Sequence, residues 1–109
     1  MMANDIYKNA LNSLGYTDDS AIQRKAVTVI NQVYDDLFEA VGAKEYSPVT
    51  SLSSEIDFPE EKIKTAFTYG VAEKLALGEG DGELQQYFML LYRKAKAKLT
   101  RVERVKNII

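Results

Sequence analysis

Acidic residues are the side chains of this 109-residue chain that could do chemistry in pairs, and they stand at 18–19, 35–36 and 60–61. Two carboxylates can serve as general acid and base only when both reach the same reacting group. Each pair is adjacent in sequence, and neighbouring positions of a helix point about 100° apart. We therefore interpret the pairs as helix caps and solvated helix faces rather than as a catalytic site.

A glycine-rich stretch, GEGDG at 78–82, is the second candidate for chemistry. A phosphate-binding loop would need a following Lys and Ser or Thr after a strand, whereas this stretch follows a helical pattern. The acidic residues Glu79, Asp81 and Glu83 alternate as calcium ligands do, but the twelve-residue EF-hand pattern is missing. The stretch is typical of a turn between two helices.

The absent residue types narrow the chemistry further. The chain has no His, the commonest general base and metal ligand, and no Cys, which excludes thiolate chemistry and disulfides. A catalytic Ser would need a base, and the sequence places no Lys to act as one. We predict a protein that is not an enzyme and that uses no cofactor, metal or small-molecule substrate.

The charge of the chain changes sign after residue 92. Residues 1–92 hold seven Lys and Arg against fifteen Asp and Glu, a balance of −8, whereas residues 93–109 carry +6. Cations near the end of a helix are favoured by its dipole, which explains part of this bias. The remaining interpretations are contact with a nucleic-acid backbone and docking on an acidic protein surface. No aromatic residue follows Tyr92, which argues against a stacking platform for single strands.

Periodicity predicts an all-α fold in a single domain over 1–109. Apolar residues recur at helical spacing over 4–14, 20–41, 59–78 and 81–109, with Gly and Pro between these stretches. We expect a small bundle of three long helices and a shorter N-terminal one, with 93–109 as a basic C-terminal helical extension. The sequence holds no run of 18 apolar residues and no secretory signal, so neither a membrane span nor secretion is expected.

The helix over 20–41 has two adjoining apolar stripes. The first comprises Ile22, Ala26, Val29, Val33, Leu37 and Ala40, and the second comprises Val27, Ile30, Tyr34, Phe38 and Val41. Two stripes predict contact with more than one neighbour, so we expect this helix to be the central one. Its late acidic residues, Asp35, Asp36 and Glu39, oppose the helix dipole at a mild cost.

A long loop at about 43–58 follows, without helical period and with Val49, Leu52 and Ile56 as apolar anchors. A connection of this length is typical either of an interaction loop or of a plain packed crossover, and both interpretations stand. In the hairpin that follows, we expect Phe67 and Leu91 to be buried at the centres of their rows. Gly70 should lie at a close helix–helix contact, because glycine inside a helix costs about 1 kcal/mol unless packing requires it.

The last helix narrows to one apolar stripe after Leu91, which is typical of a helix that leaves the core and lies along another surface. We expect this end to bind a partner. The expected partner-binding residues are Arg93, Lys96, Leu99, Arg101, Val102, Arg104, Val105 and Ile109.

The order of these signals resembles the small head–tail connector proteins of tailed bacteriophages, also called adaptor or neck proteins. The matching stretches are ALNSLGY at 10–16, VINQVYDDLF at 29–38, SLSSEIDFPE at 51–60, YGVAEKLALGEGDGE at 69–83 and FMLLYRKAKAKL at 88–99. The resemblance implies a helical subunit of a ring, often dodecameric, stacked under the portal at the capsid vertex. It carries no catalytic residues.

Two functions are therefore expected from the sequence. The first is a structural ring subunit, made in the bacterial cytoplasm and placed in the virion at the head–tail junction. Its partners would be further copies of itself and the portal or neck proteins, with DNA touched only as it passes through the ring. The alternative is a small helical DNA-binding protein, such as a packaging or regulatory factor. Long helices and an acidic first 92 residues fit that alternative poorly.

Overall fold

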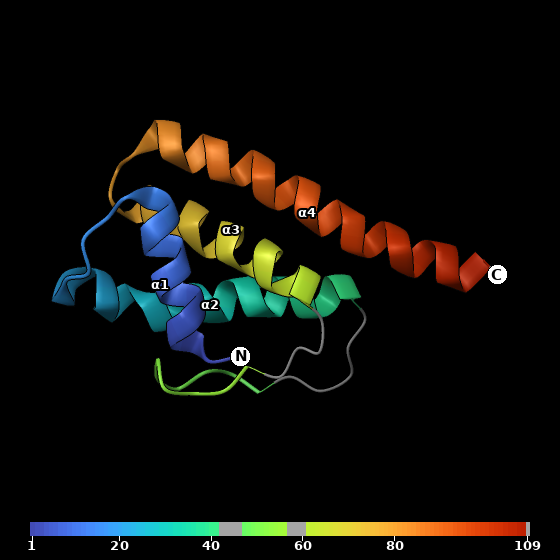
Figure 1. Cartoon of the computed structure of the whole chain (residues 1–109), viewed down its shortest axis with the longest axis horizontal. Coiled ribbons are helices and arrows are strands. Elements are labelled where there is room, and N and C mark those ends of the chain that lie inside the picture. Colours follow the sequence, from blue (N-terminus) through green and yellow to red (C-terminus); the bar gives the residue numbers. More distant parts are fainter. Residues whose placement is uncertain (42–46, 57–60, 109) are drawn as a thin grey trace.

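A computed structural model describes the backbone of residues 1–41, 47–56 and 61–108, and the side chains of 1–40, 47–56 and 63–99. Within these ranges the chain forms four helices: α1 (Ala3–Leu14), α2 (Ser20–Val41), α3 (Glu61–Gly78) and α4 (Gly82–Ile108). The prediction of an all-α bundle with one short and three long helices is confirmed (Figure 1). Gly42, which follows the predicted helix over 20–41, and Pro59, where the next helix is predicted to start, lie outside the described residues.

The turn between α1 and α2 is built from a glycine and two aspartates. Gly15 has a left-handed φ of +72°, which ends α1 in the conformation that glycine adopts most readily. Asp19 accepts a hydrogen bond from the Ile22 N–H at 2.8 Å and so caps α2. The Tyr7 hydroxyl donates to Asp18 at 2.6 Å, which ties the buried side of α1 to the same turn.

The turn between α3 and α4 brings the two helices together as an antiparallel pair. Gly80, with φ of +73°, is the left-handed residue, while Gly78 remains the last residue of α3. The Asp81 N–H then donates to the Ala76 carbonyl at 2.9 Å, as is usual behind a left-handed C-terminal glycine. Asp81 also accepts from the Leu84 N–H at 3.4 Å, at the start of α4. The predicted turn between two helices is present, and Asp81 caps α4.

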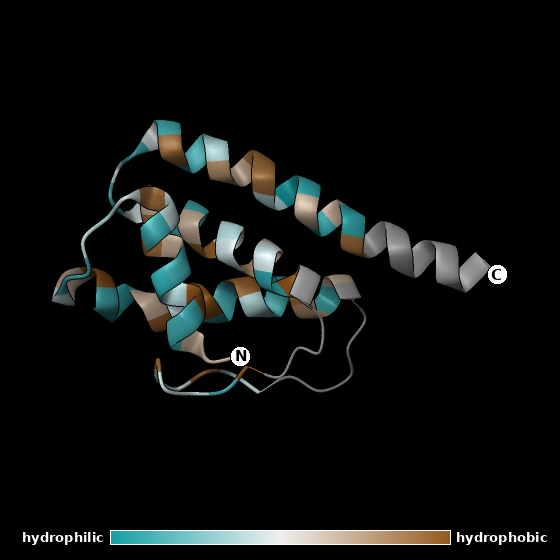
Figure 2. Cartoon of the chain, viewed as in Figure 1, coloured by the Kyte–Doolittle hydropathy of each residue, from teal (hydrophilic) through white to brown (hydrophobic). Residues whose placement is uncertain are grey.

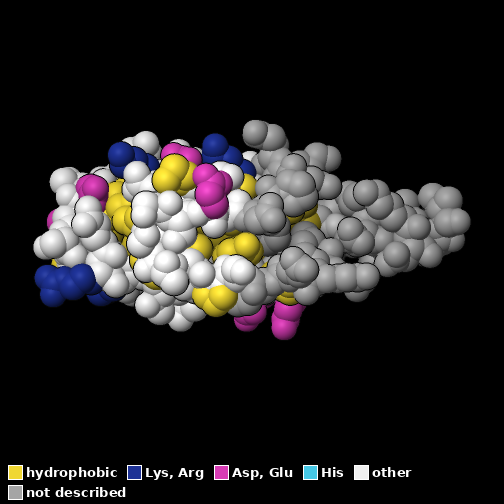
Figure 3. Space-filling model, turned by 90° about the horizontal axis from the view of Figure 1, so that it is seen from below, with side chains coloured by type: hydrophobic (Ala, Val, Ile, Leu, Met, Phe, Trp, Pro, Cys, Tyr) yellow, Lys and Arg dark blue, Asp and Glu magenta, His cyan; other side chains and the backbone are white. Residues whose placement is uncertain are grey.

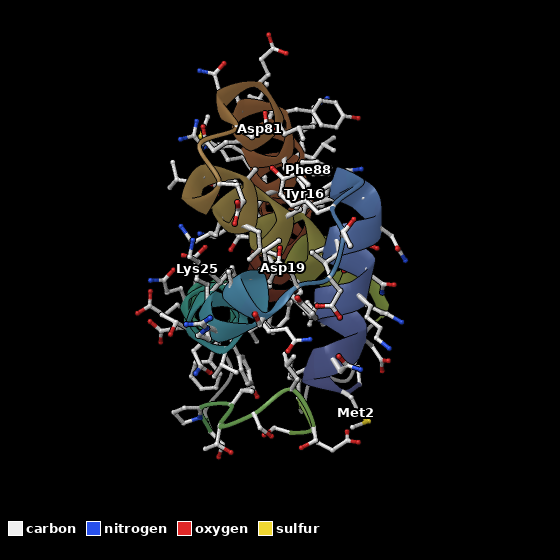
Figure 4. All side chains as sticks on the ribbon, turned by 90° about the vertical axis from the view of Figure 1, so that its left-hand side faces the viewer. Met2, Tyr16, Asp19, Lys25, Asp81 and Phe88 are labelled. Atoms are coloured by element: carbon white, nitrogen blue, oxygen red, sulfur yellow. The ribbon has the colours of Figure 1, made fainter. Side chains whose placement is uncertain are left out.

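A tyrosine links the two turns. The Tyr16 hydroxyl donates to Asp81 at 3.2 Å, and Figure 4 shows these side chains close together at the end of the bundle where α4 begins. At the same end Lys25 of α2 approaches Glu79 at 3.9 Å, with both side chains largely exposed. These contacts hold the start of α2 and the start of α4 at one end of the molecule.

The central helix is α3 rather than the predicted α2, although α2 does contact more than one neighbour, as its two stripes predicted. α3 packs against all three other helices and lies between α4 and α2 in Figure 1, with α1 across one side. Its small residues, Ala66, Gly70, Ala72 and Ala76, are all buried and let neighbours approach closely. The second stripe of α2 is less buried than its two-stripe pattern suggested, because Val27 and Phe38 are only partly covered.

The hydrophobic core draws on every helix and on the long loop. Its largest fully buried side chains are Tyr7, Phe67, Ile6, Ile30, Leu37, Ile56, Val33 and Val71. The predicted burial of Phe67 is confirmed, and its ring centroid lies 5.8 Å from that of Tyr34 on α2. Leu91, which was also predicted to be buried, is only partly buried.

The described part of the long loop, 47–56, contains no helix and packs against the body. Val49 and Ile56 are buried and Leu52 is partly buried, as their apolar character indicated. Asn31 of α2 forms two hydrogen bonds with the Val49 backbone, from its amide to the carbonyl at 2.9 Å and from the Val49 N–H at 2.7 Å. The loop is therefore anchored at its start by a side chain of α2.

The same loop caps α1. The first N–H groups of a helix have no partner within the helix. The Ala3 N–H donates to the Ser54 carbonyl at 2.9 Å, and the Asn4 N–H donates to the Leu52 carbonyl at 2.8 Å. An isolated bridge joins Met2 and Glu55 beside them. This role gives 52–55 a structural purpose that the sequence did not indicate.

Candidate assembly surface

The C-terminal half of α4 extends beyond the helix that it packs on. α3 has 18 residues and ends at the turn from which α4 starts, and α4 has 27 residues, so α4 is longer by about nine residues. At about 1.5 Å per residue, the excess is roughly 13 Å. Figure 1 shows α4 running past the rest of the bundle toward its C-terminal end.

The predicted partner-binding residues divide into three groups. Arg93 is exposed on the outer side of α4. Leu99 is buried in the core, with 7% of its surface exposed, and Lys96 is partly buried and bonded to α2. The remaining predicted residues have side chains outside the described part of the chain: Arg101, Val102, Arg104, Val105 and Ile109.

Asp36 joins α2 to α4. The Tyr92 hydroxyl donates a short hydrogen bond to its carboxylate, and the Lys96 ammonium lies 2.9 and 2.8 Å from its two oxygens. Burial alone would raise the pKa of Asp36, but the bonds from Lys96 and Tyr92 outweigh burial and hold that pKa below its ordinary value. Burial and the bond to Asp36 both raise the pKa of Tyr92.

Sequence reasoning treated Asp36 only as a solvated acid that opposes the dipole of its helix. The structure places it beside a cation and a hydroxyl from α4, which offset that cost. The signal that could have found this contact is the spacing of Tyr92 and Lys96. They stand four apart, so on a helix they face the same neighbour.

Gly70 fixes how closely α4 can approach. A Cβ atom placed on Gly70 would lie 2.7 Å from Val33 Cγ1 of α2 and 2.9 Å from Tyr92 Cε1 of α4. The predicted close helix–helix contact at Gly70 is therefore confirmed, and it involves three helices rather than two. The missing side chain lets the Tyr92 ring lie over α3 and reach Asp36.

A groove of about 420 Å³ lies beside this contact. It is lined by Gln32, Val33, Asp35, Asp36, Glu39, Lys74 and Tyr92. Three of these side chains are carboxylates and one is a cation, so the groove suits a basic partner better than an acidic one. Within the described ranges no group of three His, Cys, Asp or Glu residues is arranged to hold a metal ion.

The outer side of α4 carries apolar side chains that the core does not use. Tyr87 is 57% exposed and Leu90 is 59% exposed, and they lie one turn apart on the helix. Arg93 and Lys94 follow Leu90 by three and four residues and are also exposed. Figure 2 shows hydrophobic residues along the first half of α4, well before the basic end.

Wider comparison adds no relative. The chain matches no protein-family model, no curated protein and no solved structure. None of the helices, over the residues described, is both long enough and apolar enough to span a membrane. The features of the molecule that bear on its function are therefore the extended end of α4, the acidic groove and the exposed side of α4.

Proposed function

We propose that this chain is a structural subunit of a ring at the head–tail junction of a tailed bacteriophage, and that the C-terminal end of α4 docks on the portal. The proposal rests on the resemblance of five ordered stretches to head–tail connectors and on the form of α4. The role is structural rather than catalytic. The subunit would be made in the bacterial cytoplasm and incorporated into the virion.

The observation that carries the proposal is the extension of α4 beyond α3. An amphipathic helix that continues past its own bundle can place its apolar side in a groove of a partner. Leu99 is the last buried side chain among the described residues of α4. Leu99 is also the last residue of α4 whose side chain the structure describes, so the stretch assigned to a partner is defined by its helical backbone, which continues beyond α3.

Charge supports the same role. Residues 93–109 carry +6, of which +2 lies after Leu99, while the preceding 92 residues carry −8, so this end of α4 differs in charge from the body that holds it. A basic helix is steered toward an acidic surface, while its apolar stripe, with Val102 and Val105, would supply most of the affinity. The Asp36 contacts fix the direction in which α4 leaves the bundle, because they hold Tyr92 and Lys96 against α2.

The test compares the full chain with a chain that stops after Leu99. Each protein is mixed with its cognate portal and studied by co-sedimentation and negative-stain microscopy. We expect the full chain to add a ring of density beneath the portal and the shortened chain to remain in the supernatant. A circular dichroism spectrum that stays helical shows that the shortened chain is folded. Equal assembly of both chains on the portal would overturn the proposal.

The same two proteins test the DNA-binding alternative. Phosphate contacts by several cations make duplex affinity fall steeply with salt. We expect weak duplex binding at physiological salt by fluorescence anisotropy. Tight binding that disappears with residues 100–109 and has a steep salt dependence would favour a DNA-binding protein instead.

A further inference from the structure

The outer side of α4 presents a defined surface of four side chains, which we name the outer stripe: Tyr87, Leu90, Arg93 and Lys94. All four are exposed and lie within two turns on one side of the helix. Single exposed apolar residues are normal on a protein surface. Here an aromatic ring and a leucine are adjacent and are bordered by two cations, which is the composition of a docking surface with an apolar centre and a charged edge.

A second surface, on α2, has the opposite charge. We name it the acidic stripe: Gln32, Asp35 and Glu39, which are exposed and spaced three and four residues apart. Its two carboxylates lie in the last half of α2, where the dipole disfavours negative charge. Figure 3 shows Asp and Glu side chains at the lower edge near the middle of the molecule, where no Lys or Arg side chain of the described residues is visible beside them.

Among the residues that the structure describes, neither stripe forms an ion pair. The ion pairs of the described residues are those of the N-terminus with Glu55, Lys25 with Glu79 and Lys96 with Asp36, so they include no member of either stripe. Lys74 lies in the groove beside Asp36, where its charge helps to lower the pKa of Asp36. Two acids on α2 and two cations on α4 thus have no ion-pair partner among the described residues and are available to a partner.

We infer that the outer stripe of α4 docks on the acidic stripe of α2 of a second copy of this chain. The two stripes are different surfaces with complementary charge, so the contact is heterologous, and repeating it yields a closed ring or an open filament. Tyr87 and Leu90 supply the apolar centre, and Arg93 and Lys94 face Asp35 and Glu39. This inference deepens the proposed function by naming the contact between neighbouring subunits, and it leaves the extension after Leu99 for the portal.

The apolar centre is tested with two leucines of nearly equal exposure. Leu90 is 59% exposed in the outer stripe, and Leu77 is 60% exposed on α3. Self-association of the full chain is measured by sedimentation velocity over a concentration series, without portal. We expect Leu90→Ser to weaken association by about tenfold or more, as loss of a central apolar contact does, while Leu77→Ser leaves it unchanged. Equal effects of the two substitutions, or none at Leu90, would overturn the inference.

The charges are tested by exchange. One variant carries Asp35→Lys and Glu39→Lys, and the other carries Arg93→Glu and Lys94→Glu. Each should fail to self-associate, because like charges then face each other, and an equimolar mixture of the two should associate again. The self-association of the parent chain should weaken as salt is added, because salt screens the attraction between the two stripes. A parent that stays monomeric at its highest soluble concentration, or a mixture that does not associate, would contradict the contact.

The outcomes for the neighbour contact and for the portal are separable. A chain that stops after Leu99 retains both stripes, so it should self-associate like the parent even if it cannot bind a portal. Self-association without portal binding would support the neighbour contact and count against the proposed portal role. Portal binding by a parent chain that never self-associates would support the portal role and count against the neighbour contact.

Discussion

α3 and α4 form one antiparallel pair, yet they use their surfaces in opposite ways. Between residues 63 and 76 of α3 only Thr65 is exposed, whereas between residues 84 and 99 of α4 only Phe88, Tyr92 and Leu99 are buried. α3 touches each of the other helices, and α4 touches mainly α3. The first is an internal scaffold, and the second has one side for the bundle and the others for solvent or partners.

The difference follows from side-chain size more than from hydrophobicity. α3 alternates large apolar residues with small ones, and its buried Ala66, Gly70, Ala72 and Ala76 let three helices approach it. α4 has few small residues in its first half but carries large ones on more than one side, so part of its apolar surface stays outside the bundle. Small residues at close contacts thus mark the scaffold, and unused large ones mark the surface for partners.

The largest expected effect of a single substitution is at the centre of α3. Phe67→Ala removes a fully buried ring that packs beside Tyr34 and leaves a cavity in the middle of the bundle. We expect the free energy of unfolding, measured with urea, to fall by about 3–5 kcal/mol. Leu90→Ala on the exposed side of α4 is the matched control and should change it by less than about 0.5 kcal/mol. Similar losses at both positions would contradict the contrast between the helices.

A smaller loss is expected where the three helices meet. Gly70→Ala gains helix propensity of about 1 kcal/mol but crowds Val33 and the Tyr92 ring, at a cost of about 1–3 kcal/mol. The ring cannot easily move aside, because its hydroxyl is bonded to Asp36. We expect a net destabilisation of roughly 1 kcal/mol by urea unfolding. Gly82→Ala at the start of α4, with nothing within 4 Å, should be neutral or stabilising. A more stable Gly70→Ala variant would show that the close approach is not required.

The contact between α4 and α2 should contribute less again. Tyr92→Phe keeps the ring and removes the hydroxyl that donates to Asp36, so we expect a loss of about 0.5–1.5 kcal/mol. Lys96 would still pair with Asp36 in this variant. Because 33% of the Lys96 side chain and 42% of the Asp36 side chain are exposed, this pair contributes about 1 kcal/mol at most. Tyr87→Phe, on the exposed side of α4, serves as the control and should have no measurable effect.

Alkaline pH offers a second measurement on the same contact. Tyr7, Tyr16 and Tyr92 all have pKa values raised above 10.0 in the folded protein, by burial and by hydrogen bonds to aspartates. Above that pH the unfolded chain releases tyrosine protons that the folded chain retains, so the free energy of unfolding should fall as pH rises. In urea titrations above about pH 10, the free energy of unfolding of Tyr92→Phe should fall less steeply with pH than that of the parent. An unchanged slope would mean that Tyr92 is not protected in the folded state.

Sequence patterns predicted the helices well because helix signals are local. The apolar period, the caps at Asp19 and Asp81 and the glycine at Gly15 act within one or two turns, and all are present. Contacts between distant residues were harder to predict. The pairing of Asp36 with Tyr92 and the capping of α1 by 52–54 join residues about fifty positions apart, and no local pattern encodes such neighbours. Gly70 was the exception, since an unfavourable glycine inside a helix itself indicates a close contact.

The smallest effect on stability is expected where α4 leaves the bundle. A stop after Leu99 removes residues that extend beyond α3 and keeps every described contact of Tyr92, Lys96 and Leu99 with the core. We therefore expect the free energy of unfolding to change by less than about 0.5 kcal/mol. A stop after Tyr92 is the control, because it also removes the Lys96 ion pair and the buried Leu99 and should cost roughly 2–5 kcal/mol. Urea unfolding of both chains measures the two effects. A large loss of free energy of unfolding on removing only residues 100–109 would show that this end is part of the folded body. In that case α4 would resemble α3 along its whole length.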